Sequence, residues 1–180
     1  MNTELSWKSG LFSTTIDIYR NERKIGFIKV PFFSNTAKAE IDGKKIEFRE
    51  FGSAFVPKAD IFDVAKNEMI GGIKDEPEKP VAYIKLNDEI STFTVKSSVK
   101  WTIHNESEQN IFYNGVFPGI RGKIEMNNYN PIQLLSGFYI AQIYSRITAI
   151  IFYSVALLAG FFLLPRAYLA IKGLLWNFFF

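Results

Sequence analysis

The C-terminal part of the chain contains a run of 18 residues without a charged side chain, residues 147–164, which lies between Arg146 and Arg166. A helix of this length measures roughly 27 Å, close to the thickness of the hydrocarbon core of a bilayer. The run therefore either crosses a membrane or lies in the dry interior of a protein. We expect it to be a transmembrane segment, and the alternative is a helix that packs on protein.

Charge is distributed unevenly along the sequence. Three of the 21 Lys and Arg residues lie in residues 131–180, which contain no acidic residue, and the other 18 balance the 18 acidic residues of residues 1–130. The first part is thus charge-balanced, and the second is apolar and weakly cationic. These totals argue against nucleic acid as a partner, because the basic excess lies within the apolar segment and not in a basic stripe.

Residues 1–130 have the alternation of β-hairpins. In TAKAEIDGKKIEF (36–48), apolar and charged residues alternate on both sides of Asp42-Gly43, a turn signal because both central positions need positive φ. Similar hairpins have turns centred near residues 22, 67, 88 and 107, so the hairpin recurs at intervals of about 19 to 24 residues. A final run, RGKIEM (121–126), supplies at least one more strand.

Five hairpins and one or two further strands amount to about eleven or twelve short strands, and a sheet of this size usually closes to remove its edges. The sequence therefore predicts a mainly β fold with a C-terminal helix. It is an antiparallel meander of about 12 strands, closed into a barrel around a central hydrophobic α-helix that extends beyond the barrel. A barrel of this size has an interior too wide for its own side chains to fill, and the C-terminal helix is the apolar segment available.

The predicted helix starts with Asn130 as N-cap and Pro131 as its first residue. From residue 132 to residue 164 it is about 50 Å long, roughly twice the height of a barrel of six- to eight-residue strands. Pro165 is expected to end or kink it. The predicted regions are the β-barrel (1–130), a core helix (131–146), its transmembrane continuation (147–164) and an interfacial amphipathic tail (165–180).

Several residues of this helix are candidates for a role at a membrane. Arg146 is the expected boundary on the barrel side, and Arg166, Lys172 and Trp176 are expected near the other boundary. Three polar residues on an otherwise apolar helix offer a path for lipid headgroups, namely Ser136, Gln142 and Ser145. Ala156 and Gly160 form a small-xxx-small pair that would support a homo-oligomer.

The sequence contains no catalytic signature. His104 is the only histidine, no G-x-S-x-G stretch accompanies it, and there is no cysteine. We therefore expect no catalytic residue, no bound metal and no cofactor, and we do not predict an enzyme. The N-terminal residues lack the pattern of a secretory signal, so the barrel is expected on the cytoplasmic side of a membrane.

The hairpins IDIYRNERKIGFIKV and ADIFDVAKNEMIGGIK, followed by the apolar PIQLLSGFYIAQIYSRITAIIFY, resemble the tubby C-terminal-like superfamily. That superfamily includes the tubby domain, the plant LURP-one-related proteins and the phospholipid scramblases. The resemblance covers residues 11–164 and implies a twelve-stranded barrel around a hydrophobic helix, which in scramblases is also interpreted as a membrane segment.

The chain departs from this resemblance in two places. Scramblases carry an acidic calcium-binding segment near the helix, whereas KIEMNNYNPI offers only Glu125. Tubby domains bind phosphoinositide headgroups through clustered basic side chains, whereas this charge-balanced barrel offers weak support for such a cluster, with Lys44-Lys45 as a basic pair between strands.

Three functions follow as hypotheses. The first is a non-enzymatic, membrane-anchored tubby-like barrel that acts as a lipid-proximal binding or scaffold module. The second is scramblase-like lipid transport along the polar residues of the helix. The third is a soluble oligomer that buries the C-terminal helix in a partner.

Overall fold

The computed structural model describes residues 3–10, 13–53, 56–76, 79, 81–106, 110–116 and 120–179, and their side chains except those of residues 53, 56, 57 and 160–179. The chain forms two compact units, Met1–Ile143 and Tyr144–Phe180. Unit 1 contains all the described strands and the beginning of the helix α1 (Pro131–Phe179).

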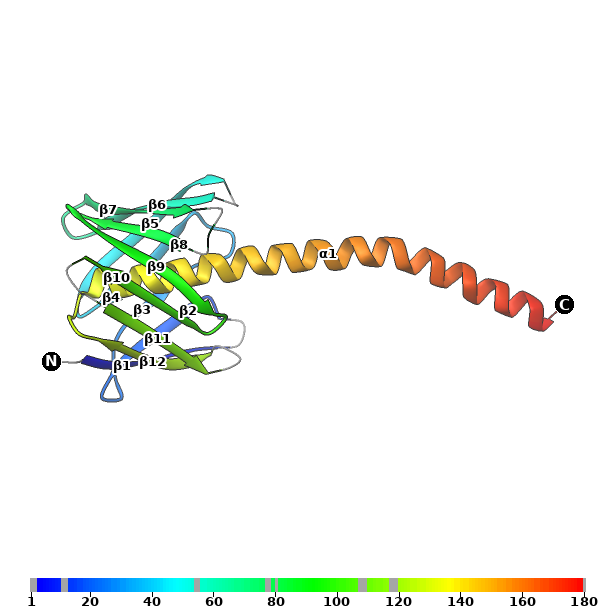
Figure 1. Ribbon diagram of the computed structural model, residues 1–180, viewed down its shortest axis with the longest axis horizontal. Coiled ribbons are helices and arrows are strands. Elements are labelled where there is room, and N and C mark those ends of the chain that lie inside the picture. Colours follow the sequence, from blue (N-terminus) through cyan, green and yellow to red (C-terminus); the bar gives the residue numbers. More distant parts are fainter. Residues whose placement is uncertain are drawn as a thin grey trace. The chain divides into compact units, whose positions relative to one another are not determined.

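The described strands of unit 1 form one closed antiparallel barrel in which each strand pairs with its neighbours in sequence, and β1 pairs with β12 (Figure 1). This confirms the predicted barrel. The strands are β1 (Thr3–Ser9), β2 (Thr15–Arg20), β3 (Arg23–Lys29), β4 (Thr36–Ile41), β5 (Lys44–Ser53), β6 (Val56–Asp63), β7 (Glu68–Glu76), β8 (Val81–Leu86), β9 (Glu89–Ser97), β10 (Lys100–Asn105), β11 (Asn110–Val116) and β12 (Arg121–Met126).

The hairpin turns lie where the sequence predicts them. Asn21, Asp42, Asn67 and Asn87 all have positive φ, between 48° and 54°, and Gly43 follows with a φ of 79°. Asn, Asp and Gly tolerate this left-handed conformation, which the tight turns need in order to match the twist of the strands. The turns predicted near residues 22, 43, 67 and 88 are therefore confirmed, and most of the one predicted near residue 107 lies outside the described residues.

Two hairpins contain a β-bulge beside a glycine. The register shifts between Ile18 and Tyr19 on β2 and between Ile61 and Phe62 on β6. In the paired strands, a Cβ atom on Gly26 would lie 2.3 Å from the carbonyl oxygen of Glu40, and one on Gly71 would lie 2.3 Å from that of Lys85. Glycine at these two positions lets neighbouring strands approach closely where the sheet bends.

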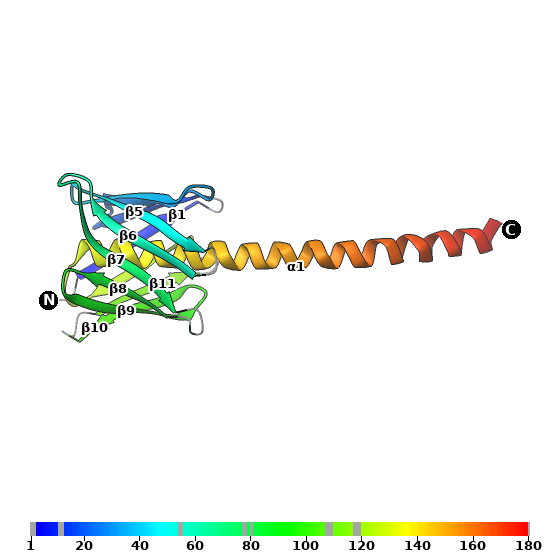
Figure 2. The same cartoon turned by 90° about the horizontal axis from the view of Figure 1, so that it is seen from above.

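Helix α1 begins with the predicted cap. The Asn130 side-chain oxygen accepts hydrogen bonds from the backbone N–H groups of Ile132 (3.1 Å) and Gln133 (3.2 Å). Residues 133–140 and Ile143 are buried, and this part of the helix runs along the inside of the barrel (Figures 1 and 2). The helix thus provides the core that the strands close around.

Aromatic side chains fill the space between the helix and the strands. The Phe138 ring makes edge contacts with Trp7 at 5.7 Å and with Tyr113 at 5.1 Å between ring centroids. On another side of the helix, Tyr139 stacks on Phe48 at 4.7 Å. These large rings explain how one helix fills a barrel of this width.

The two ends of the barrel differ in their connections. One end, called here the hairpin end, carries the turns at 21–22, 42–43, 64–67 and 87–88 and the link from β12 to α1. The other, called the exit end, carries the loops that follow the odd-numbered strands. Because α1 starts at the hairpin end and runs through the barrel, the chain leaves unit 1 at the exit end, after Ile143 (Figure 2).

The sequence predicts that Pro165 ends or kinks helix α1, and the structure shows that the helix does not end there. It is continuous from Pro131 to Phe179. A proline in a helix removes one hydrogen bond, here to the carbonyl of residue 161, and its ring crowds the same carbonyl, a local cost that this helix tolerates. The predicted tail 165–180 is therefore helical as far as Phe179.

Candidate functional site

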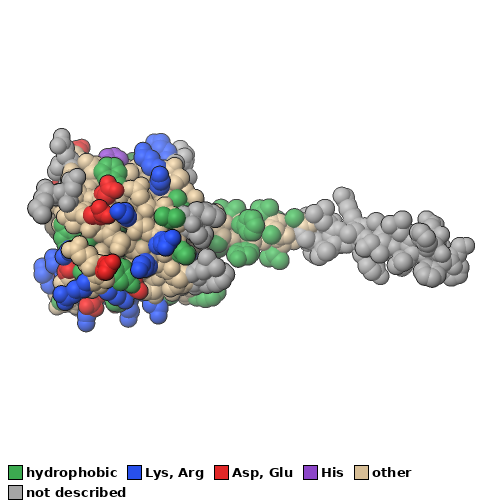
Figure 3. Space-filling view, turned by 90° about the horizontal axis from the view of Figure 1, so that it is seen from below, with side chains coloured by type: hydrophobic (Ala, Val, Ile, Leu, Met, Phe, Trp, Pro, Cys, Tyr) green, Lys and Arg blue, Asp and Glu red, His purple; other side chains and the backbone are tan. Residues whose placement is uncertain are grey.

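Within the described part of the chain, one helical segment, Pro131–Ala159, is long and apolar enough to cross a membrane by length and composition. Beyond Ile143 none of its described side chains is buried. The large apolar side chains between residues 150 and 158 are 38% to 75% exposed, and Figure 3 shows one face of this segment. Because successive helical residues are about 100° apart, these positions are distributed all around the helix axis. An apolar helix of a soluble protein would bury at least one of its faces.

Burial along α1 ends close to the predicted membrane boundary. Ile143 is the last buried side chain, at 2% exposure. Tyr144 and Arg146 are half-buried, and Ser145 is exposed. The division between the two compact units also follows Ile143, three residues before Arg146.

The other predicted boundary residues cannot be placed in the same way. The side chains of Arg166, Lys172 and Trp176 lie outside the described residues, so their role at the boundary stays a prediction. Of the small-xxx-small pair, Ala156 is exposed, whereas the surroundings of Gly160 lie outside the described residues. Association through this pair is likewise untested.

The three polar residues of the predicted lipid path do not form one line. Ser136 is fully buried in the barrel, and its hydroxyl donates a hydrogen bond to the carbonyl of Ile132 at 2.8 Å. Gln142 is half-buried and Ser145 is exposed. Ser136 and Ser145 are nine residues apart, which is two and a half helical turns, so they lie on opposite sides of α1.

Buried polar contacts fix α1 within the barrel. The Gln133 amide donates to the Ser91 hydroxyl, and both side chains are buried. The Tyr113 hydroxyl donates to the carbonyl of Leu134 at 2.8 Å, and burial holds the pKa of Tyr113 well above its usual value. These contacts help to set the rotation and depth of the helix, because a shift would break buried hydrogen bonds.

A polar cluster at the hairpin end joins the segment before α1 to the first hairpins. The Tyr129 hydroxyl donates to the Asp42 carboxylate at 2.5 Å, and the Arg20 guanidinium lies 3.3 Å from the same carboxylate and 4.8 Å from the centre of the Tyr129 ring. Partial burial, and then the bond to Asp42, raise the pKa of Tyr129. Lys44 and Lys45 are exposed nearby in sequence.

Charge is polarised along the barrel, a feature that the net charge of the sequence conceals. When each strand is divided at its midpoint and each loop is assigned to its end, the described exit half has 11 basic and 4 acidic residues, a net charge of +7. The described hairpin half has 7 basic and 12 acidic residues, a net charge of −5. Both signs are visible on the face shown in Figure 3.

The basic residues of the exit half are Lys8, Lys29, Lys38, Arg49, Lys58, Lys74, Lys79, Lys96, Lys100, Arg121 and Lys123, and the acidic ones are Asp17, Glu50, Asp75 and Glu76. The basic residues of the hairpin half are Arg20, Arg23, Lys24, Lys44, Lys45, Lys66 and Lys85. Its acidic residues are Glu4, Glu22, Glu40, Asp42, Glu47, Asp60, Asp63, Glu68, Asp88, Glu89, Glu106 and Glu125.

Two exposed aromatic residues lie at the exit end, in the loop between β3 and β4. The side chain of Phe33 is 97% exposed and that of Phe32 is 45% exposed, and their rings meet edge to face at 5.1 Å. Exposed aliphatic residues also occur towards the hairpin end, for example Met69 and Ile90, but each follows an acidic residue in the sequence. Only the exit end combines exposed aromatic rings with a positive charge among the described residues.

The described residues contain no group of three or more His, Asp or Glu side chains arranged to hold a metal ion. Comparisons with protein-family models, with curated proteins and with solved structures give no match for this chain. The resemblance to the tubby C-terminal-like superfamily therefore stays a prediction, and the proposals below rest on the geometry of this molecule.

Proposed function

We propose that the protein is a non-enzymatic, membrane-anchored barrel of the tubby-like type, which acts as a lipid-proximal binding or scaffold module. The observation that carries the proposal is the change along α1 from complete burial inside the barrel to exposure of apolar side chains on every side beyond residue 147. The first half of the helix is the core of a water-soluble barrel, and the second half has the surface of a membrane span.

The size of the exposed apolar surface supports a bilayer as the environment of this segment. Burial of one large apolar side chain stabilises a protein by about 1.5 to 3 kcal/mol. Seven such side chains between residues 150 and 158 are 38% to 75% exposed, so about 6 to 13 kcal/mol is unrealised if the helix stays in water. A bilayer surrounds a helix on all sides, whereas a single protein partner covers one face.

Lipid transport has less support than anchoring. A headgroup path needs polar groups along one side of the helix, and Ser136 and Ser145 lie on opposite sides. The soluble oligomer remains the competing explanation, because several partner helices together would also cover the segment.

Membrane extraction of the full-length chain tests the anchor. We expect the protein to stay in the membrane pellet after an alkaline carbonate wash. The matched variant carries Phe152→Arg and Leu157→Arg, which together oppose insertion by about 5 to 7 kcal/mol, and we expect it in the wash. Release of the unaltered chain as a discrete oligomer, measured by light scattering, would support the soluble oligomer and overturn the proposal.

We place the barrel on the cytoplasmic side of the membrane, and the positive exit end supports this orientation because basic groups near a span are retained on that side. The chain has no cysteine, so a single Asp88→Cys substitution gives a unique reporter. In intact cells we expect a membrane-impermeant maleimide to label Cys-substituted protein only after permeabilisation. Labelling of intact cells would place the barrel on the opposite side.

A further inference from the structure

We propose that the exit end of the barrel is itself a membrane-contacting surface, which docks on anionic lipid headgroups and inserts Phe32 and Phe33 at the level of the interface. The proposal rests on the membrane anchor proposed above. It adds a lipid class, a surface and an orientation for the barrel: the exit end faces the bilayer and the hairpin end faces the aqueous phase.

Chain length brings the exit end close to the bilayer. Ile143 is the last buried residue of the helix, and the uncharged run begins at residue 147. Residue 147 is four residue steps from Ile143, which is about 6 Å along a helix and at most about 14 Å when fully extended. The headgroup region of one leaflet is roughly 5 to 7 Å thick, so Ile143 lies in the headgroup region or within about 9 Å of it, whatever direction the helix takes.

The charge of the exit end suits an anionic surface. Lys29, Lys96, Lys100 and Arg121 are exposed and form no ion pair within the part of the chain that the structure describes. A basic side chain near an anionic leaflet contributes about 1 kcal/mol to binding. Several together are enough to bias the orientation of a barrel that is already anchored.

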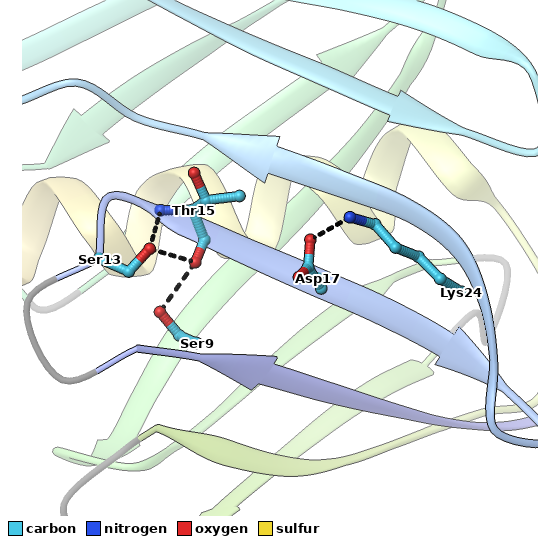
Figure 4. A network of polar contacts seen from close by, with 5 residues as sticks. All are labelled: Ser9, Ser13, Thr15, Asp17 and Lys24. Carbon is cyan, nitrogen blue, oxygen red and sulfur yellow. Dashed lines mark hydrogen bonds and ion pairs between the residues drawn. The ribbon is translucent and has the colours of Figure 1, made fainter.

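The acidic residues of the exit half are largely compensated. Asp17 lies 2.6 Å from the ammonium group of Lys24 (Figure 4). Glu76 pairs with Lys79 at 3.2 Å and accepts a hydrogen bond from the Tyr83 hydroxyl at 3.0 Å. Asp75 is 7% exposed. The charge offered to a ligand at this end is therefore positive.

The loop that carries the two phenylalanines is held in place by hydrogen bonds. The Ser34 hydroxyl accepts a hydrogen bond from the backbone N–H of Thr36 at 3.1 Å, and the Glu50 N–H donates to the Asn35 carbonyl at 2.6 Å. A fixed loop presents its aromatic rings at little entropic cost on binding. Apolar rings at the same end of the barrel as an excess of basic side chains are the features expected of an interfacial anchor.

A bilayer fits this surface better than a second copy of the chain. Contact between two exit ends would bring two net-positive surfaces together. The acidic hairpin end of another anchored copy would face away from the membrane. The occupant that satisfies both the aromatic pair and the charge is a leaflet that contains anionic lipid.

A spin label on the full-length chain tests the proposal. Asn35→Cys places a nitroxide beside Phe32 and Phe33 without removing either ring, and Asp88→Cys is the matched position at the hairpin end. The protein is reconstituted in vesicles of phosphatidylcholine, alone or with about 30% phosphatidylserine, and depth is measured by collision with oxygen and with a water-soluble nickel chelate. We expect the label at position 35 to move from water towards the interface when phosphatidylserine is present, and the label at position 88 to stay in water.

Substitutions separate charge and aromatic contributions. We expect the combined changes Lys29→Glu, Lys96→Glu and Lys100→Glu to abolish the phosphatidylserine-dependent shift at position 35. Phe32→Ser with Phe33→Ser should leave the label at position 35 shallower than in the unaltered protein in the vesicles that contain phosphatidylserine. The control, with the same change in net charge at the hairpin end, is Lys44→Glu, Lys45→Glu and Lys85→Glu, and it should keep the shift. Circular dichroism verifies that each variant is folded.

Two results distinguish this proposal from the anchor on which it depends. A label at position 35 that stays fully aqueous in anionic vesicles, in protein that resists carbonate extraction, would overturn the docking surface and leave the anchor intact. Equal behaviour of the exit-end and hairpin-end charge variants would also overturn it. Loss of the protein from the vesicles during extraction would instead refute the anchor.

Discussion

At the scale of single residues, Gly137 determines how closely α1 passes the barrel wall. A Cβ atom at this position would lie 2.3 Å from the Tyr113 hydroxyl oxygen and 2.7 Å from the ring carbon that carries it. The same hydroxyl bonds the Leu134 carbonyl one turn earlier. The sequence does not indicate this pair, because helical spacing identifies the buried face of α1 but not the strand residue opposite each position.

Substitution of this pair gives a test of the packing. Alanine at position 137 gains about 1 kcal/mol of helix propensity but forces a steric overlap that costs more, about 1 to 3 kcal/mol net. Tyr113→Phe should cost about 1 kcal/mol through the lost hydrogen bond. We expect Gly137→Ala combined with Tyr113→Phe to be less destabilised than the sum of the two, measured by thermal unfolding in detergent. A stabilised Gly137→Ala protein would contradict the observed contact.

Alkaline pH tests the two tyrosines whose pKa values are raised, Tyr113 by burial and Tyr129 by partial burial and its bond to Asp42. Since the folded pKa exceeds the unfolded value of about 10, their contribution to stability is complete below that pH and is lost as pH rises above it. We expect the free energy of unfolding to decline above about pH 10, and less steeply in Tyr129→Phe. Tyrosinate absorbance that reports all tyrosines ionised near this pH, with the fold intact, would refute this expectation.

At the scale of secondary-structure elements, the hairpins are predictable because their turns are encoded locally. Asp42-Gly43 and the Asn residues of the other turns specify positive φ by their own chemistry. The bulges beside Gly26 and Gly71 are not predictable in this way, since a glycine within a strand signals either a bulge or a weak point. Their shared role becomes clear only from the carbonyl groups of β4 and β8 that approach them.

Adjacent glycines in β7 allow a matched comparison. A Cβ atom on Gly71 would meet the Lys85 carbonyl oxygen at 2.3 Å, whereas one on Gly72 would meet only the Ala59 carbonyl oxygen at 3.5 Å. We expect Gly71→Ala to lower the free energy of unfolding by about 1 to 3 kcal/mol and Gly72→Ala to leave it unchanged or to raise it slightly. Thermal unfolding of the two variants in detergent tests this expectation. Equal decreases in the free energy of unfolding would show that the space at position 71 is not limiting.

Some features of helix α1 are likewise predictable from the local sequence, whereas others depend on the rest of the fold. The cap at Asn130 is predicted by local sequence and confirmed by its two hydrogen bonds. The end of burial at Ile143 depends on the height of the barrel, which the sequence specifies only through strand lengths and tilt. Continuation through Pro165 cannot be deduced from sequence because the cost of a proline depends on the strength of the turns around it.

At the scale of the whole molecule, closure of the sheet around α1 follows from the number of strands and from the apolar helix. The polarity of the barrel does not follow from composition, because a net charge of zero over residues 1–130 adds together residues from opposite ends. In a meander, successive connections alternate between the two ends. The positive charge of the exit end therefore appears only when charged residues are grouped by the end of the barrel at which they lie. A sum along the chain conceals it.

The pairing of β1 with β12 also constrains the order of events during synthesis. The helix that occupies the interior follows the last strand in the chain, so the barrel cannot be completed before residue 143 has left the ribosome. Until then the nascent chain holds an open sheet with two unpaired edges and an uncovered apolar face, a state prone to aggregation. Closure of the sheet around the helix is therefore a late step, which follows synthesis of the last strand and of the buried part of α1.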